Sequence, residues 1–233
     1  MTAAPIHIGA DRLMLDPSGA LFWPARRLLA VSDLHLEKGT SFARRGMLLP
    51  PWDTQATLDR LALLLRRYRP ITVVTIGDSF HDRAAAARLP AAEVARIQAM
   101  TAALRFVWVL GNHDPEPADQ LGGEWVDEFA DGNLIFRHQA SPRLHAAEQN
   151  GEICGHHHPK ATVSVRGGVQ TRPCFVAGPR RLMLPAFGAY TGGLDVMHPE
   201  IFSLFPRGGR VFLLGRDRLF SFSLAQVATA GVP

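Results

Sequence analysis

Short apolar runs alternate with longer amphipathic stretches along the first half of the chain. Residues 28–31 (LLAV), 71–77 (ITVVTIG) and 106–110 (FVWVL) are mostly apolar. Their length, and the β-branched and aromatic residues in the second and third runs, are typical of buried strands. The pattern therefore predicts a strand at each of these three places.

Two segments between these runs carry apolar residues at helical spacing. The first begins at Asp53, which is predicted to be its N-cap, and ends before Pro70. The second begins at Pro90, because proline is favoured at the first positions of a helix. Their predicted inner faces are formed by Leu58, Leu61, Leu64 and Leu65 and by Val94, Ile97, Thr101 and Leu104.

The helical pattern ends near residue 134, and short strands separated by Gly- and Pro-containing turns are predicted from there on. Alternating strands and helices followed by strands predict a layered α/β or α+β protein. The chain has 233 residues without a Ser/Gly-rich linker or a change in composition, so one domain is predicted over residues 1–233.

Polar groups follow the predicted strands at the point where each strand ends. In an α/β layer the carboxyl ends of neighbouring strands open onto one crevice, so these side chains are expected to converge. Two later histidine clusters also follow short apolar runs, at 134–136 and 153–154. The five groups contain Asp33 and His35, Asp78, Asn112 with His113 and Asp114, His138, and His156 to His158.

The chemistry of these groups suits two divalent cations. They offer carboxylate, imidazole and amide ligands but no thiolate, which favours Mn²⁺, Fe or Zn²⁺. A carboxylate whose two oxygens each hold one ion brings two metals about 3.5 to 4 Å apart. Each motif alone could be a turn, a helix cap or an exposed polar run. The joint order of all five favours a two-metal site.

Charge and composition say little about the partner and the cellular compartment of the protein. Lys and Arg exceed Asp and Glu by 25 − 21 = 4, and the calculated pI is about 9.7. This excess is compatible with a polyanionic partner but is weak support for one. The N-terminus shows no secretory signal pattern, and no apolar run approaches membrane-spanning length. Cys154 and Cys174 fit no metal or disulfide spacing and are expected to be buried, so a cytoplasmic protein is predicted.

The motifs resemble those of a known family. SDLHLEKG (32–39), IGDSFHD (76–82), LGNHD (110–114) and GHHHP (155–159) together resemble the calcineurin-like metallophosphoesterases. The longer stretches DLHLEKGTSFARRGMLLPPWDT (33–54) and RPCFVAGPRRLMLPAFGAYTGGLDV (172–196) are similar to the bacterial ligase-associated DNA damage response endonucleases.

The resemblance implies a distorted β-sandwich flanked by helices, with the two-metal site at one edge. It implies that Asp78 bridges the two ions. Asp33, His35 and His158 would complete one site, and Asn112, His138 and His156 the other. A metal-bridging hydroxide would attack phosphorus in line, and His113 would assist departure of the alcohol, with Asp114 fixing the tautomer of His113.

The histidine triplet requires a choice among its members. In an extended segment, alternate residues face the same side. His156 and His158 are therefore predicted to face the metals, and His157 is predicted to point away toward the surface.

Substrate contacts are predicted in the loop after the first catalytic strand. Lys38, Arg44 and Arg45 either bind flanking phosphates or belong to a solvated basic loop. His81 and Asp82 either position substrate or form a local helix cap. Phe42 could stack on bases, whereas Trp52 is expected in the core.

The resemblance thus implies a phosphodiesterase that uses two divalent metal ions, Mn²⁺ first with Fe or Zn²⁺ as alternatives, and in particular a DNA nuclease linked to repair. The alternative is a phosphatase or phosphodiesterase for small phosphoesters or nucleotides, which the same metal core could serve. A metal-free interaction scaffold is disfavoured because no ligand position is lost. A DNA ligase and a helicase as partners are implied by the resemblance alone. Residues 184–196 could form a lid or a subunit contact, and the oligomeric state stays open.

Overall fold

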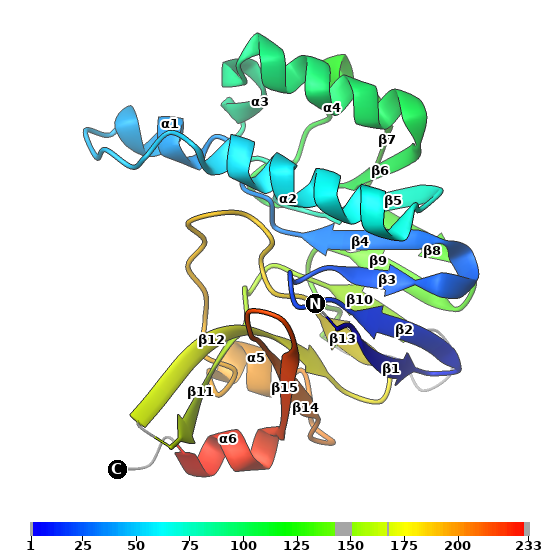
Figure 1. The fold of residues 1–233 in the computed structure, drawn as a ribbon, viewed down its shortest axis with the longest axis vertical. Coiled ribbons are helices and arrows are strands. Elements are labelled where there is room, and N and C mark those ends of the chain that lie inside the picture. The colour runs from blue at the N-terminus through cyan, green and yellow to red at the C-terminus, as the bar shows by residue number, and fades with distance from the viewer. Residues whose placement is uncertain (1, 143–150, 167, 231–233) are drawn as a thin grey trace.

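A seven-stranded sheet forms the first layer of the protein (Figure 1). The computed structural model describes residues 2–142, 151–166 and 168–230. The first four strands are antiparallel neighbours and the last four are parallel. In spatial order they are β1 (Ala4–Ile8), β2 (Asp11–Leu15), β3 (Leu21–Trp23), β4 (Leu28–Ser32), β5 (Thr72–Ile76), β6 (Arg105–Val109) and β7 (Glu124–Val126).

The second sheet is mixed, in the order β15-β14-β12-β13-β10-β9-β8, and β11 pairs with β12 beside it. Strand β10 is parallel to both β9 and β13, so β9 and β10 end at the same edge. The strands are β8 (Glu128–Asp131), β9 (Leu134–Arg137), β10 (Gly151–Cys154), β11 (Lys160–Val165), β12 (Gly168–Ala177), β13 (Arg181–Met183), β14 (Arg210–Leu214) and β15 (Leu219–Ser223).

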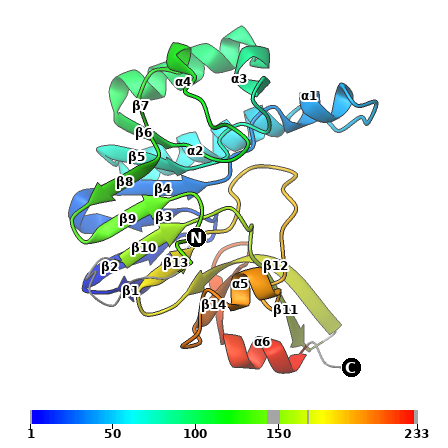
Figure 2. The same cartoon turned by 180° about the vertical axis from the view of Figure 1, so that it is seen from behind.

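Helices cover the outer faces of both sheets, as the two opposite views show (Figures 1 and 2). None of the helices in the described ranges is both long and apolar enough to cross a lipid bilayer. The α-helices are α1 (Lys38–Ala43), α2 (Asp53–Tyr68), α3 (Ala85–Arg88), α4 (Ala91–Ala103), α5 (Pro199–Phe202) and α6 (Leu224–Ala230), and two 3-10 turns are η1 (Pro24–Arg26) and η2 (Asp119–Leu121).

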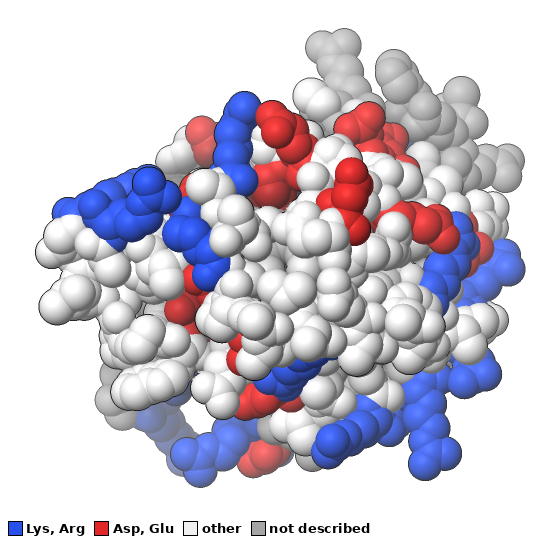
Figure 3. All heavy atoms as spheres, turned by 90° about the horizontal axis from the view of Figure 1, so that it is seen from above, with Lys and Arg blue, Asp and Glu red and all other residues white. Residues whose placement is uncertain are grey.

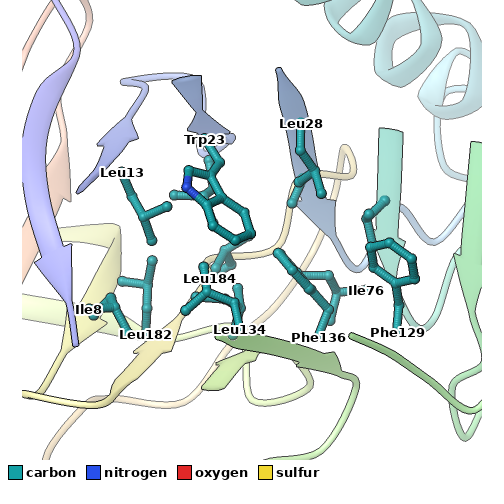
Figure 4. Close-up of a cluster of buried hydrophobic side chains, with 14 of the residues drawn as sticks. Ile8, Leu13, Trp23, Leu28, Ile76, Phe129, Leu134, Phe136, Leu182 and Leu184 are labelled. Atoms are coloured by element: carbon teal, nitrogen blue, oxygen red, sulfur yellow. The ribbon is translucent and has the colours of Figure 1, made fainter. Parts of the chain in front are cut away.

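The alternation of side chains along the central strands separates two cores. Leu28 and Ile76 face the second sheet, where they join Phe136 and Leu184 in the cluster of Figure 4. Their neighbours in sequence, such as Leu29, face the opposite side and pack against α2 and α4. A third cluster lies between the second sheet and α5 and α6. The resulting order of layers, helix, sheet, sheet, helix, confirms the predicted layered sandwich.

Two predictions around the start of α2 are wrong. Trp52, not Asp53, occupies the N-cap position, and Asp53 is the first helical residue. The Asp53 carboxylate instead accepts a hydrogen bond at 3.1 Å from the backbone N–H of Gly39, so it ties α1 to α2. Trp52 is 62% exposed and does not belong to the core, because the connection from α1 runs outside the packed layers (Figure 1).

Candidate metal centre

The strand ends bring the predicted groups together at one edge of the sandwich. Asp33 follows β4 directly, and Asp78 follows β5 after Gly77. Asp33, His35 and Asp78 all have left-handed backbone conformations, with φ of 53°, 44° and 45°. Such conformations cost free energy for residues other than glycine and persist where surrounding contacts impose them. Here the backbone N–H of His35 donates to the carbonyl of Asp78 at 2.9 Å, which locks the two turns together.

One group of possible ligands consists of Asp33, His35 and His158. The Nε2 atoms of His35 and His158 lie 3.1 Å apart, and His158 Nε2 lies 3.3 Å from Asp33 Oδ1. The other Asp33 oxygen accepts a hydrogen bond from Ser32 Oγ at 2.5 Å, which fixes the carboxylate. These side chains offer ligand atoms that lie within 4.8 Å of one another, close enough to surround one cation.

A second group consists of Asp78, His138 and His156. His138 Nε2 lies 3.4 Å from Asp78 Oδ1 and 3.1 Å from His156 Nδ1. The predicted amide ligand joins them, because Asn112 Oδ1 lies 3.0 Å from His138 Nε2. The opposite ring nitrogen of His138 lies 3.2 Å from the carbonyl of Ile76 in β5 and orients the ring.

Asp78 lies between the two groups. Its Oδ1 faces His138 in the second group, and its Oδ2 lies 3.8 Å from His35 Nε2 in the first. The side chain is 2% exposed. A backbone hydrogen bond of 2.9 Å from the N–H of His113 to Oδ1 holds it in place. The two oxygens thus point to two different ligand sets, as a bridging carboxylate requires.

Burial and charge act on these groups in opposite directions. Burial lowers the pKa of His35 to about 3 and that of His156 to about 4, which keeps both rings neutral. Burial alone would raise the pKa values of Asp33 and Asp78, but hydrogen bonds and charge from His158 and His138 hold them below the usual range. Burial would also lower the pKa of His138, but the hydrogen bond to Asp78 and the charges of Asp33 and Asp78 raise it to about 9, so this ring has to give up a proton for a cation to bind. Metal ions bind neutral imidazoles and ionised carboxylates.

The donor set fits a pair of divalent cations. Two pairs of ring nitrogens face each other at 3.1 Å, one pair in each group. An N–H···N hydrogen bond can join each pair, and with both nitrogens unprotonated the same spacing would let one cation bind both. Sulfur takes no part, because the buried Cys154 Sγ donates to the carbonyl of Leu182 at 3.7 Å. Oxygen and nitrogen ligands together favour Mn²⁺, Fe or Zn²⁺.

The histidine triplet reaches the predicted arrangement by a different backbone path. His156 and His158 both belong to the ligand groups, and His157 Nδ1 lies 3.8 Å from Glu200 Oε2 on the other side. The segment is not an extended strand, however, since φ is 72° at His156 and 47° at His158. The alternation argument for these residues is therefore wrong, and a tight turn selects which rings face inward.

His113 stands at the rim of the site with 40% of its side chain exposed. Its Nδ1 lies 2.8 Å from the carbonyl oxygen of His81, and a carbonyl can only accept, so Nδ1 carries a proton. Nε2 lies 3.9 Å from Asp78 Oδ2 and faces the ligand groups. The ring is thus held in one orientation by the main chain.

The prediction that Asp114 fixes the tautomer of His113 is wrong. Asp114 Oδ1 accepts a hydrogen bond from the backbone N–H of Gly111 at 3.0 Å, and Oδ2 accepts one from Phe80 at 3.1 Å. The carboxyl is 4% exposed, and burial raises its pKa to about 7. Asp114 therefore braces the turns after β5 and β6 and does not contact the ring of His113.

His81 forms a further imidazole cluster with His113 and His35, with ligand atoms within 4.8 Å of one another. Its ring stacks on that of His113, with centroids 5.5 Å apart. Burial, together with the positive charges of Lys38 and Arg45, lowers the pKa of His81 to about 4. A neutral His81 therefore lies at the mouth of the site, between the ligand groups and α1.

A clamp that the sequence did not reveal holds the His81 turn against α1. Arg88 donates two hydrogen bonds to the carboxylate of Asp82, at 2.8 and 2.7 Å, and a third to Thr40 Oγ1 at 3.1 Å. Asp82 also accepts from the backbone N–H of Ala84 at 3.0 Å, but Ala84 is the N-cap of α3 and has no side-chain cap, so Asp82 stabilises the turn before the helix and is not its cap. Arg88 lies in an otherwise ordinary alanine-rich stretch, so only its contacts identify its role.

The basic residues after β4 lie at the start of a short helix and in the turn after it. Lys38 is the first residue of α1, and Arg44 is its C-cap. Lys38 Nζ lies 5.7 Å from the centre of the Phe42 ring, and that ring lies 5.7 Å from the ring of His81. The side chains of Arg44 and Arg45 are exposed. Figure 3 shows Lys and Arg side chains gathered over this end of the molecule.

Residues 184–196 support the ligand turns. The backbone N–H of Phe187 donates to the carbonyl of Ser32 at 2.8 Å, and the backbone N–H of Gly188 donates to the backbone carbonyl of Asp33 at 3.1 Å. Gly188 has no room for a side chain, because a Cβ atom there would collide with the carbonyl of Leu34. The first part of this segment is thus a buried brace behind Asp33, which explains the small residues that the sequence pattern left unassigned.

Comparisons with known proteins agree with this geometry. The model of the calcineurin-like phosphoesterase family matches residues 26–173. The solved structure of the Pseudomonas putida nuclease MPE is 28% identical, with a TM-score of 0.72, and the alignment covers 95% of this chain and 100% of that chain. Yfce, a phosphoesterase from E. coli, is 14% identical with a TM-score of 0.44, over 84% of this chain and 98% of that one. No curated protein matches the sequence. The family match spans well over half of the chain and includes the ligand turns after β4, β5, β6, β9 and β10, and the chain therefore belongs to the calcineurin-like phosphoesterases.

Proposed function

We propose that this protein is a nuclease that hydrolyses phosphodiester bonds in DNA with the help of two divalent cations. Mn²⁺ is the preferred ion at both positions. The observation that carries the proposal is Asp78, whose two oxygens face two separate ligand groups. The first group would hold one ion through Asp33, His35 and His158. The second would hold the other through Asn112, His138 and His156, and Asp78 would bridge them.

Two such ions supply charge that binds phosphate oxygens and acidifies a coordinated water. The chain supplies the rest of the chemistry. In its imidazolium form, His113 would keep one proton on Nδ1 against the His81 carbonyl and direct the second, on Nε2, toward the ligand groups, where it can pass to the departing alcohol and leave the ring neutral. His81 lies beside it and contacts the substrate on the α1 side.

DNA is favoured as the substrate by the surface around the site and by one relative. Lys38, Arg44 and Arg45 form a basic end of the molecule next to His81, suited to phosphates that flank the scissile one. The related Pseudomonas putida protein is a nuclease. The further expectation of a cytoplasmic repair enzyme with a DNA ligase and a helicase as partners rests on the resemblance to ligase-associated endonucleases.

An Asp78→Asn variant tests the two-metal assignment. The amide cannot offer two anionic oxygens, so the metal content after gentle purification and Mn²⁺ reconstitution should fall at both sites. Hydrolysis of single-stranded DNA and of an aryl phosphodiester should fall by several orders of magnitude together. The matched control Asp217→Asn changes an exposed carboxylate on the β14–β15 turn and should leave both measurements unchanged.

The substrate is tested on the wild-type protein. DNA, an aryl phosphodiester and the matching aryl phosphomonoester are compared at equal metal loading. We expect the specificity constant for DNA to exceed the specificity constants for both small substrates. A monoester hydrolysed faster than DNA and the diester would replace the nuclease with a phosphatase for small phosphoesters. Two retained metals with normal turnover in Asp78→Asn would refute the bridging role itself.

A further inference from the structure

A groove of about 520 Å³ lies between the ends of α2 and α4, away from the candidate metal centre. Its floor is apolar and includes Leu65, Met100 and Leu104. Four arginines also line it: Arg27, Arg66, Arg69 and Arg96. No acidic residue and no aromatic ring lines it within the described part of the chain. An apolar floor beside a cationic rim offers the two kinds of contact that an acidic, amphipathic ligand can use.

The groove lies at the edge of the sheet opposite to the ligand turns. Arg27 directly precedes β4, Pro70 comes just before β5, and Leu104 directly precedes β6. These strands are parallel, so their amino ends share one edge and the groups after their carboxyl ends share the other. A strand of five residues spans about 16 Å, so the groove is separate from the phosphoester site.

The charge of the groove is largely uncompensated. Arg96 is neutralised by Asp59 at 2.6 Å and Glu93 at 3.6 Å. Arg27 donates to the carbonyl of Arg69 at 2.8 Å and forms no ion pair with a carboxylate of the described residues. The exposed guanidinium groups of Arg66 and Arg69 make no ion pair within the described ranges. Three positive charges therefore surround an apolar floor, and Figure 3 shows Lys and Arg side chains on the side where α2 ends.

We propose that this groove binds an acidic polypeptide segment that carries a large apolar side chain. The apolar side chain would occupy the floor over Leu65 and Met100, and neighbouring carboxylates would pair with Arg27, Arg66 and Arg69. Arginine suits such pairing because its planar group binds carboxylates in a bidentate manner. Nucleic acid fits less well, since unpaired bases bind on aromatic platforms, which this groove lacks, and phosphates make no use of an apolar floor. The groove is thus a protein-docking surface on the back of the enzyme.

The test uses a fluorescein-labelled synthetic peptide in which Leu recurs at helical spacing between Glu residues, titrated with the full chain and followed by anisotropy. Arg66→Glu with Arg69→Glu should weaken binding by about tenfold or more, because two attractive charges become repulsive. Ala103→Trp should weaken it as well, because Ala103 lines the groove and the indole would fill it without changing any charge. The matched control is Arg207→Glu with Arg216→Glu, which makes the same charge change at exposed sites elsewhere and should bind like wild type.

Two further comparisons separate this groove from general attraction to a basic protein. A peptide with each Leu replaced by Ser should bind at least about tenfold more weakly, because the floor contributes. Equal binding by that peptide, or an equal loss in the Arg207 and Arg216 control, would overturn the proposal. Loss of DNA affinity without loss of peptide affinity in the groove variants would make the groove a nucleic-acid surface instead. Turnover of an aryl phosphodiester should stay at the wild-type level in every variant, which also reports that the fold is intact and that the result is independent of the proposed nuclease function.

Discussion

His113 is more exposed than three of the proposed ligand histidines. The side chains of His35, His138 and His158 are 3%, 5% and 16% exposed, whereas that of His113 is 40% exposed. Its Nδ1 binds the carbonyl of His81, so the main chain holds the ring, as the carbonyl of Ile76 also does for His138. The position of His113 at the rim is the basis for the proposed role as proton donor.

A His113→Gln variant should therefore keep its metals and lose chemistry. We expect DNA cleavage to fall by about 10²- to 10⁴-fold, because the departing alcohol of DNA needs a proton. An aryl phosphodiester, with its more acidic leaving group, should lose much less. Metal content and both rates are measured on the same sample. A metal-free variant would show instead that His113 is a ligand.

The histidine triplet gives a second comparison between neighbouring residues. His157→Ala removes a ring that faces Glu200 and should leave metal content and turnover near the wild-type level. His156→Ala and His158→Ala each remove a proposed ligand, and either should lower both. Metal content of the three variants after identical purification ranks them. A loss in His157→Ala as large as in the other two would contradict the assignment.

For single residues, the sequence predicted which side chains lie close together, but it did not always predict which contacts hold them there. Every proposed ligand lies in one of the two groups because strand ends determine where side chains meet, and strands are readable from apolar runs. The partner of His113 was mispredicted, because Asp114 is adjacent in sequence while the His81 carbonyl is 32 residues away. Adjacent residues do not necessarily contact each other, and a backbone carbonyl leaves no trace in the residue pattern.

At the scale of elements, the turn after β5 is held by α3. Arg88 in α3 bridges Asp82 and Thr40, so it joins the His81 turn to α1. Neither Arg88 nor Asp82 belongs to the proposed ligand groups. They act on the site through the position of His81.

Arg88→Ala should therefore release His81 without releasing the metals. We expect weaker DNA cleavage with a larger change in KM than in kcat, and unchanged metal content. Arg88→Lys keeps the charge but cannot make the two parallel bonds, so it should recover only part of the loss. Arg83→Ala, in the same turn but with an exposed ion pair to Glu116, is the matched control and should have little effect. Equal loss of metal and turnover in Arg88→Ala would mean that the clamp supports the whole centre.

The sequence predicted the strands that are buried on both faces and the two longest helices. β4, β5 and β6 are buried on both faces and read as apolar runs, and α2 and α4 follow their apolar spacing. β1, β2 and β3 were missed, because they are short strands in which exposed and buried residues mix. α1 was expected to be a loop, since it has only six residues and depends on Asp53 of the next helix for a hydrogen bond at its first turn.

At the scale of the whole molecule, the parallel strands separate two basic ends. One end lies over α1 beside the candidate metal centre, and the other lines the groove where α2 and α4 end. The net charge of +4 was compatible with a polyanionic partner but was weak support for one. The fold places part of the positive charge beside a site that contains Phe42 and His81, and part along a groove that contains no aromatic ring among its described lining residues.

The two ends should therefore respond differently to salt when DNA binds. Arg44→Ala with Arg45→Ala should weaken DNA binding, and the slope of log affinity against log salt should shrink by about 0.7 to 0.9 for each lost phosphate contact. Turnover of an aryl phosphodiester should stay near wild type, because that substrate reaches only the metals. The control Arg207→Ala with Arg216→Ala removes the same charge from other exposed positions and should leave the slope unchanged.

Equal losses on DNA and on the small diester would mean that the α1 arginines support the structure of the centre. Binding that is unchanged in both strength and slope would place them on the solvated surface and would favour a small-molecule phosphoesterase over the nuclease.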